Sequence, residues 1–270
     1  MFVLPVYWVV AAAAAGLGFG AVSGVVSARR LYFLAGGMPH TALVAVLAGL
    51  LASSFIGGSV YAWSVLFASV FSLFAWLLLR LGVDPERAAA VYVAFASSLA
   101  VILAYYVLSG VEVHQSLWAY VLGDPLLVSP ADTVFIASVS LAALLAVYTI
   151  YRGVVIVALD PGFAESVGIR AWLYDLASVL LLAVVSTAML RVAGFVLEHV
   201  LILVPGIIAA RITSSASSAL RASILVAVSA SLAGLAAGCL LDASPSGAAG
   251  LILSLLYILV LARRSSGGAG

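Results

Sequence analysis

The sequence predicts an all-α membrane protein that crosses the bilayer about nine times, and its composition is the first reason. Hydrophobic residues occupy 66% of the 270 positions, charged residues occupy 8%, and the mean hydropathy is +1.32. A soluble domain usually carries about 25% charged residues, so this chain lacks the side chains for a water-facing surface. Its net charge of +1 is too small to favour nucleic-acid binding.

Long apolar segments are the second reason. A membrane-spanning helix needs about 20 predominantly apolar residues, and segments of that length recur from end to end. One short segment could be re-entrant, which would leave eight spans. The whole chain, 1–270, is therefore expected to form a single transmembrane domain. The expected spans lie near 4–27, 31–51, 55–79, 88–108, 131–150, 171–190, 193–210, 220–240 and 247–262.

The distribution of arginine predicts the orientation in the membrane. All eleven basic residues are arginines. With nine spans and an external N-terminus, only Arg191 falls outside and the other ten face the cytoplasm. Because Lys and Arg in short loops favour the cytoplasmic side, we expect an N-out, C-in protein of the cell membrane. Asp175 lies near a cytoplasmic boundary and is expected to pair with Arg170.

The longer outer loop, 109–132, contains aromatic residues of the kind that favour the membrane interface. An external interfacial helix is expected at about 112–122, followed by a break at Gly-Asp-Pro and a new helix capped near Ser129 or Asp132. His114 in this loop is a candidate contact for an external metal or partner, although an exposed loop histidine is the simpler interpretation.

The inner loop contains the segment DPGFAESVG, at about 160–168, which predicts a short capped helix. Asp160 suits the N-cap, Pro161 suits the first helical position, and Gly168 suits the position just past the end. Such a helix on the cytoplasmic face is either a docking element or a connector that rests on the membrane. The spacing alone does not separate these two interpretations.

The side chains of this short helix are expected to differ in exposure. Phe163, Ala164 and Val167 are expected to share one face. Glu165 is most simply a solvated residue.

Ionisable residues inside spans are costly and by default indicate function, and His40 is the first of them. It follows Arg30 by ten residues, which places it roughly 15 Å along a helix at 1.5 Å per residue. Gly36, Gly37 and Pro39 precede it and weaken the helical hydrogen bonding there. By itself, a lone histidine is more often a packed residue than a ligand.

Glu198 and His199 form the second group, seven and eight residues in from Arg191 and so roughly 11 Å deep. An unpaired carboxylate at that depth needs a proton or a cation, and imidazole with carboxylate suits zinc, manganese or iron. The alternative is a structural pair, Glu198 with His199 or with Arg191. Adjacent residues point about 100° apart on a helix, so the two would border one cavity without facing the same point.

Motifs for enzymatic chemistry are absent from the sequence. It contains no GxxxxGK[ST] nucleotide-binding motif and neither HExxH nor GxSxG. A single cysteine, Cys239, excludes a cysteine metal cage. We therefore expect a transport protein rather than an enzyme.

Four segments, in this order and spacing, resemble the permease subunits of zinc and manganese ABC importers, the ABC-3 family. The resemblance covers roughly residues 5–262. The segments are RRLYFLAGGMPHTAL, LGDPLLVSPAD, YRGVVIVALDPGFAESVGI and VAGFVLEHVLILVPGIIAARI.

The resemblance implies a homodimer whose translocation path follows the two-fold axis, with no permanently bound cofactor. Cytoplasmic ATPase subunits would hydrolyse ATP, and the segment containing Asp160 matches the coupling helix on which they dock. An extracellular or periplasmic metal-binding protein would deliver the ion, zinc or manganese. His40 matches the family histidine linked to metal passage.

Two departures from the family pattern bear on the metal. Many members have an acidic residue four positions before the histidine, where this chain has Gly36. Many also have small residues where this chain has Glu198 and His199. We expect these two side chains to supply the ligands that Gly36 lacks, with zinc, manganese, iron and cobalt all open as cargo.

The sequence therefore predicts a metal-import permease that works by alternating access. Its ligands, His40, Glu198 and His199, would bind weakly enough to release the ion. One alternative is an ion- or proton-coupled secondary transporter without an ATPase, against which the coupling-helix segment argues. A weaker alternative is a membrane scaffold that transports nothing.

Overall fold

The computed structural model describes residues 5–110, 126 and 128–267, and this part of the chain is helical without strands. The predicted interfacial helix at 112–122 and His114 lie outside the described residues. The helices are α1 (Val6–Arg29), α2 (Tyr32–Ile56), α3 (Val60–Arg80), α4 (Pro85–Gly110), α6 (Pro130–Leu159), α7 (Pro161–Ser166), α8 (Ala171–Ile212), α9 (Ala216–Leu241) and α10 (Pro245–Gly267).

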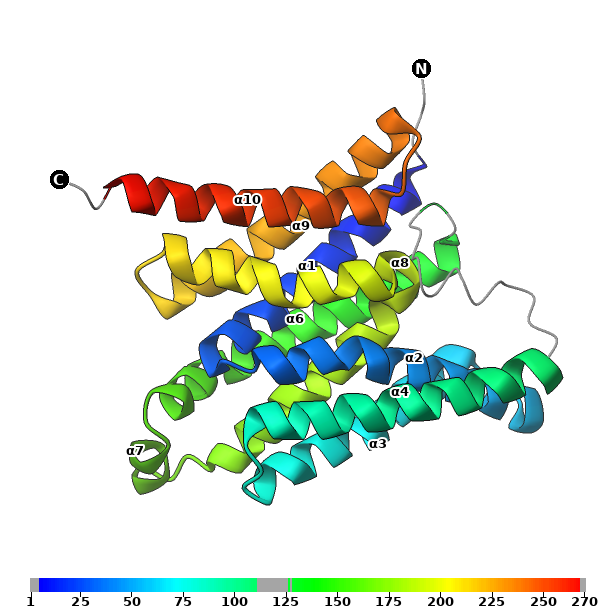
Figure 1. The fold of residues 1–270 in the computed structure, drawn as a ribbon, viewed down its shortest axis with the longest axis horizontal. Coiled ribbons are helices and arrows are strands. Elements are labelled where there is room, and N and C mark those ends of the chain that lie inside the picture. The colour runs from blue at the N-terminus through cyan, green and yellow to red at the C-terminus, as the bar shows by residue number, and fades with distance from the viewer. Residues whose placement is uncertain (1–4, 111–125, 127, 268–270) are drawn as a thin grey trace.

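Within the described residues, nine helical segments are long and apolar enough to cross a membrane, which confirms the predicted number. Helix α8 holds two of them, Ala171–Leu190 and Val192–Ile212. Figure 1 shows the chain turning back between these two halves, so they form a hairpin. The turn lies at Gly194, where φ is 69° and ψ is 165°.

The backbone at Gly194 yields a stability prediction. This region of φ and ψ is essentially restricted to glycine. Gly194→Ala is therefore expected to lower the free energy of unfolding by about 1–3 kcal/mol, measured by thermal unfolding of the purified protein. Gly250→Ala is the control, because a Cβ there meets only ordinary contacts at 3.8 Å. Equal stability of the two variants would contradict a glycine-only backbone conformation at Gly194.

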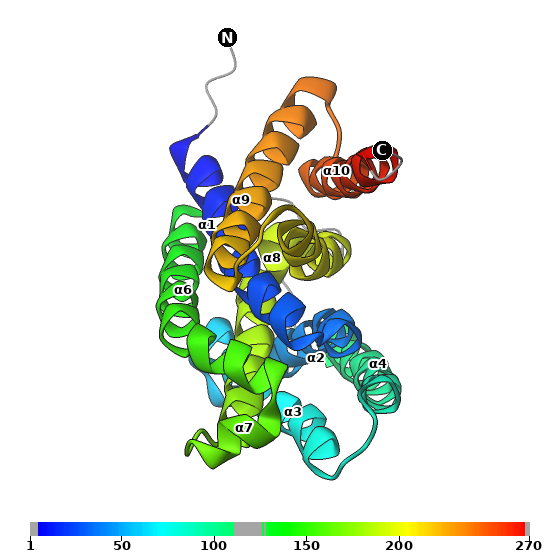
Figure 2. The same cartoon turned by 90° about the vertical axis from the view of Figure 1, so that its left-hand side faces the viewer.

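The helices form two groups that α8 joins. Helix α1 packs against α6, α8 and α9, while α2 packs against α3, α4 and α8. Contact between α1 and α2 is slight. Figure 2 shows α8 between the α1–α9–α10 side and the α2–α4 side. A side chain on α2 that meets one on α8 therefore lies at the junction of the groups.

Small residues let α1 approach its neighbours closely. A Cβ on Gly16 would lie 2.7 Å from Cα of Val228, and one on Gly20 would lie 2.6 Å from Cα of Ile224. Close backbone approach of this kind strengthens van der Waals packing, which holds helices together where lipid offers no hydrophobic driving force. The core around α1 is thus specified by its glycines and alanines.

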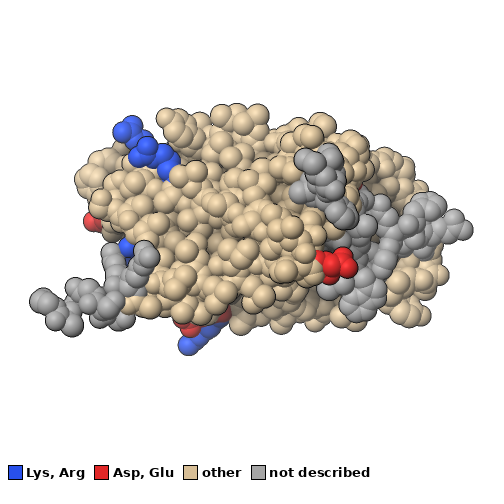
Figure 3. Space-filling view, turned by 90° about the horizontal axis from the view of Figure 1, so that it is seen from above, with Lys and Arg blue, Asp and Glu red and all other residues tan. Residues whose placement is uncertain are grey.

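Predicted features at the helix ends are confirmed. The Ser129 hydroxyl accepts a hydrogen bond from the Asp132 backbone N–H at 3.2 Å, and the Asp132 carboxylate accepts one from the Ser129 N–H at 2.9 Å. This capping box begins α6. On the face shown in Figure 3, the arginine side chains gather toward one end of the molecule. We use the name arginine-rich end for the end of the molecule where Arg29 lies in the last turn of α1, Arg80 lies over the ring of Trp172, and Arg211 lies in the last turn of α8.

Candidate ion site and docking helix

The structure brings together two histidines that are 159 positions apart in the sequence. The ring centroids of His40 on α2 and His199 on α8 lie 6.0 Å apart, at an interplanar angle of 89°. Phe195 contacts both rings, at 4.9 Å from His40 and 4.8 Å from His199. Both histidines are partly exposed, and they lie at the junction of the two helix groups.

Hydrogen bonds hold both imidazoles through Nδ1. The Nδ1 of His40 lies 2.9 Å from the Ser97 hydroxyl on α4. The Nδ1 of His199 lies 2.7 Å from the Phe195 carbonyl oxygen. A carbonyl oxygen only accepts, so this bond places the proton of a neutral His199 ring on Nδ1 and leaves the lone pair on Nε2. Metal-binding histidines are commonly oriented in this way.

The spacing of the two rings suits a shared ion. Two imidazoles on one zinc, with Zn–N distances of about 2.0–2.1 Å, have ring centres roughly 5–6 Å apart. The observed separation is therefore close to that of two ligands of one metal ion.

Glu198 does not join this pair. Its side chain is 0% exposed, and neither carboxylate oxygen has a hydrogen-bond partner in the described part of the chain. The Ser186 hydroxyl on the other half of the α8 hairpin is an electrostatic neighbour, but it too has no hydrogen bond of acceptable geometry. Among described residues, no three His, Cys, Asp or Glu side chains are close enough to hold an ion. A site that takes ligands from all three of His40, Glu198 and His199 therefore stays a prediction, which one chain alone does not form among its described residues.

The open face of α2 contains His40. Most of the helix is buried around it, but Phe33, Gly36, His40 and Leu43 are partly or fully exposed at helical spacing. A Cβ at Gly36 would have nothing within 4 Å. The position where many family members have an acid is thus open space, one helical turn from His40.

Helix α2 continues through Pro39, so the weakened hydrogen bonding predicted there does not break it. The hydroxyls of Thr41 and Tyr92 form a buried hydrogen bond between α2 and α4. Thr41 also donates to the Gly37 carbonyl at 3.4 Å. The Thr41–Tyr92 bond and the His40–Ser97 bond hold the segment around His40 against α4.

The predicted short inner helix is confirmed as α7. The Asp160 carboxylate accepts a hydrogen bond from the Phe163 N–H at 2.9 Å and caps the helix. Pro161 is its first residue, and Gly168 has φ of +82° just after it. The expectation that Phe163, Ala164 and Val167 share one face is wrong. Phe163 and Val167 are 57% and 54% exposed, whereas Ala164 is 0% exposed. Adjacent positions differ by about 100°, so small Ala164 packs inward while its neighbour points out.

A profile of the ABC 3 transport family matches residues 3–264. The chain belongs to this family. It is thus a multi-pass protein of the cell membrane, in agreement with its apolar helices.

Two curated relatives and one solved structure show what this ABC 3 family chain is similar to. A Thermotoga maritima protein named "Probable metal transport system membrane protein" is 27% identical over 90% of this chain and 83% of its own length. The manganese transport system membrane protein MntC of Halalkalibacterium halodurans is 25% identical over 80% of this chain and 73% of its own. The structure of PsaBC from Streptococcus pneumoniae in complex with Fab superposes with a TM-score of 0.79 at 20% identity, covering 94% of this chain and 89% of that one.

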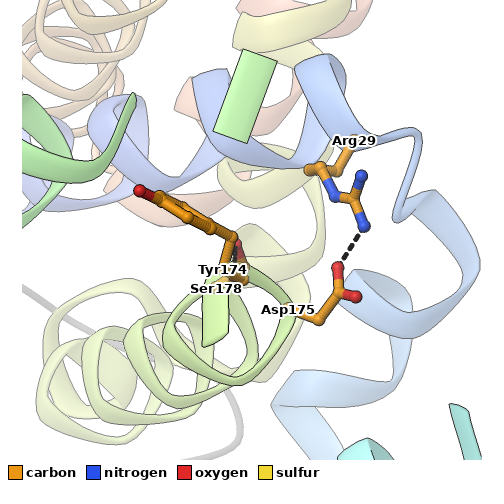
Figure 4. Close-up of polar contacts among 4 residues, drawn as sticks. All are labelled: Arg29, Tyr174, Asp175 and Ser178. Carbon is orange, nitrogen blue, oxygen red and sulfur yellow. Dashed lines mark hydrogen bonds and ion pairs between the residues drawn. The ribbon is translucent and has the colours of Figure 1, made fainter. Parts of the chain in front are cut away.

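One charged contact in this ABC 3 family protein differs from expectation. Asp175 forms an ion pair with Arg29 rather than with Arg170, as Figure 4 shows. Arg29 ends α1 and Asp175 lies in the first turns of α8. The two are 146 positions apart, so the sequence neighbour was the wrong partner.

The Arg29–Asp175 ion pair provides a second stability prediction. Asp175→Asn removes the charge that compensates a largely buried guanidinium, so we expect a loss of about 1.5–3 kcal/mol in the free energy of unfolding. Arg170→Gln should leave stability unchanged. The measurement is thermal unfolding of both variants in the same detergent. A larger loss of stability in Arg170→Gln than in Asp175→Asn would make Arg170 the partner of Asp175.

Proposed function

We propose that this chain is the membrane permease of an ATP-driven importer of divalent transition metals, with zinc as the favoured cargo. The proximity of His40 and His199 is the observation that carries this proposal. It supplies two nitrogen ligands at the junction of two helix groups, where a change in packing would alter the distance between them. Relatives named as metal transport membrane proteins support the same class of cargo.

A second copy of the chain would complete the ligand set. Two histidines are too few for an ion that takes four ligands. Both rings are partly exposed in the single chain, so a two-fold axis beside them would bring two further imidazoles. We propose that the homodimer holds the ion in this way, briefly and weakly, and that alternating access moves it across.

The donor set favours zinc over manganese. Imidazole nitrogens suit zinc, whereas manganese favours carboxylate and other oxygen ligands. Gly36 removes the carboxylate that many family members have beside the histidine, and Glu198 stands apart from the pair. The test is uptake of radiolabelled zinc and manganese by vesicles holding the permease and its ATPase. We expect ATP-dependent zinc uptake, which excess manganese inhibits weakly; preferential manganese uptake would contradict the cargo assignment.

Glu198 remains a proposed residue of the pathway, because an unpartnered carboxyl inside a bilayer is costly and usually functional. Glu198→Gln keeps the size and removes the carboxyl group. We expect it to lower zinc uptake, because the carboxyl is then no longer available to the passing ion. Uptake equal to wild type would make Glu198 a structural residue.

The proposed partners follow from α7. Cytoplasmic ATPase subunits would dock on its exposed Phe163 and Val167, and an extracellular metal-binding protein would deliver the ion at the opposite end. Uptake that requires ATP supports this arrangement. Uptake driven by a proton or ion gradient without ATP would instead favour a secondary transporter.

A further inference from the structure

A cavity of about 480 Å³ opens at the arginine-rich end, between α1, α6, α8 and α9. Neither His40 nor His199 lines it, so it is separate from the proposed ion site. Its walls are largely made of small residues, which leave room for a ligand. They include Gly24, Ala28, Ala158, Gly206, Ala210 and Ala219.

The polar lining of this cavity is suited to an anion. Arg29, Arg30, Ser27 and Tyr151 contribute to it, and no acidic residue does. One guanidinium nitrogen of Arg29 binds Asp175, but its Nε is buried and has no hydrogen-bond partner in the described part of the chain. Within the same described part, Arg30 forms no ion pair.

The beginning of α9 adds to the positive potential. Ala216, its first residue, and Ala219 both line the cavity. The Ser215 hydroxyl caps one backbone N–H, that of Ser218, whereas the N–H groups of the first turn have no carbonyl partner within the helix. These groups favour a negative charge placed against them.

We propose that this cavity binds a phosphate group, with Arg30 and the first turn of α9 as its donors. An anionic lipid headgroup from the adjacent leaflet and a free phosphate ion share this chemistry. The surroundings favour the lipid, because α6 and α9 both pack against α1 without packing extensively against each other. Leu159, at the end of α6, lines the cavity and is largely exposed, so an acyl chain has apolar surface beside the mouth. Basic pockets between transmembrane helices bind such headgroups.

The test is native mass spectrometry of the purified full-length chain after delipidation. Phosphatidylglycerol, phosphatidylcholine and inorganic phosphate are added in separate titrations. We expect phosphatidylglycerol to bind at least about tenfold more tightly than phosphatidylcholine. Arg30→Gln should remove about tenfold of that affinity, because it removes charge-assisted hydrogen bonds to phosphate.

Two further variants keep the test decisive. Arg87→Gln removes an exposed arginine of α4 outside the cavity and should leave lipid binding unchanged. Ala219→Phe keeps both arginines but fills the cavity, so it should weaken binding even if Arg30→Gln fails to fold.

The outcomes separate the sources of phosphate. If inorganic phosphate bound in a way that depended on Arg30, and phosphatidylglycerol bound no more tightly than phosphatidylcholine, the cavity would be assigned to a free phosphate ion. Binding of neither probe, or equal losses in Arg30→Gln and Arg87→Gln, would overturn the proposal. If Arg30→Gln weakened capture of the ATPase subunit but left lipid binding unchanged, that result would also overturn the proposal and make the cavity a protein contact.

Discussion

His40→Ala is expected to reduce ATP-driven zinc accumulation at least about 100-fold, because it removes one of the two nitrogen ligands that a single chain offers. Even loss of a group that only supports a ligand commonly costs 10–100-fold in metal affinity or activity. His199→Ala should have a similar effect. Since the two rings act on one ion, the double variant should be little worse than either single variant. The measurement is initial zinc uptake at equal amounts of folded permease.

Matched variants separate ligand loss from misfolding. Leu43→Ala changes another partly exposed residue on the same face of α2 and should retain nearly full uptake. Ser97→Ala removes the hydroxyl 2.9 Å from Nδ1 of His40 and should cost about tenfold, because it frees the ring without deleting it. Additive losses for His40 and His199 would show that the two side chains serve different sites.

Phe163→Ala is expected to weaken capture of the ATPase subunit about 30-fold or more. A large side chain that projects from a short, capped helix is a suitable anchor, and anchors at interfaces contribute about 2 kcal/mol or more. ATP-driven uptake should fall in parallel, while the thermal stability of the isolated permease should not change. Pull-down of the ATPase subunit by the tagged permease measures the effect.

Ile212→Ala is the control for this prediction. Ile212 is 54% exposed, ends α8 and lies at the same arginine-rich end, but it is outside α7. It should leave ATPase capture unchanged. Capture that is insensitive to Phe163→Ala would make α7 a connector resting on the membrane, the other interpretation that its sequence allows.

Local features were predictable from the sequence. Apolar length located the nine spans because lipid requires each to be a continuous helix. Asp160, Pro161 and Gly168 placed α7 because their roles depend on neighbours within a few positions. The capping box of Ser129 and Asp132 is local for the same reason.

Contacts between distant segments were harder to predict. The pairing of His40 with His199 depends on how α8 folds back and packs on α2, which no local pattern encodes. Phe195 had a signal, since it stands one helical turn before His199, but Ser97 on α4 had none. Asp175 pairs with Arg29 rather than with the predicted Arg170, because helix packing, and not sequence proximity, brings the Arg29 guanidinium close to it.

Glu198 shows the limit of arguments from depth. Its position in a span indicated a costly carboxyl, and its complete burial agrees. Depth does not give direction around the helix; the adjacent positions of Glu198 and His199 did indicate different directions, and the structure separates Glu198 from the histidine pair. A one-residue difference in position is enough, because neighbours on a helix diverge by about 100°.

The most direct test of the histidine site is the location of zinc in the proposed assembly of two copies of this chain with ATPase subunits. Anomalous diffraction at the zinc absorption edge, on crystals of a complex trapped with a hydrolysis-deficient ATPase, would show the ion. We expect a peak on the two-fold axis, about 2.0–2.1 Å from Nε2 of His40 and His199 of both copies. A zinc peak elsewhere in the membrane region, with both histidines unliganded, would contradict the account.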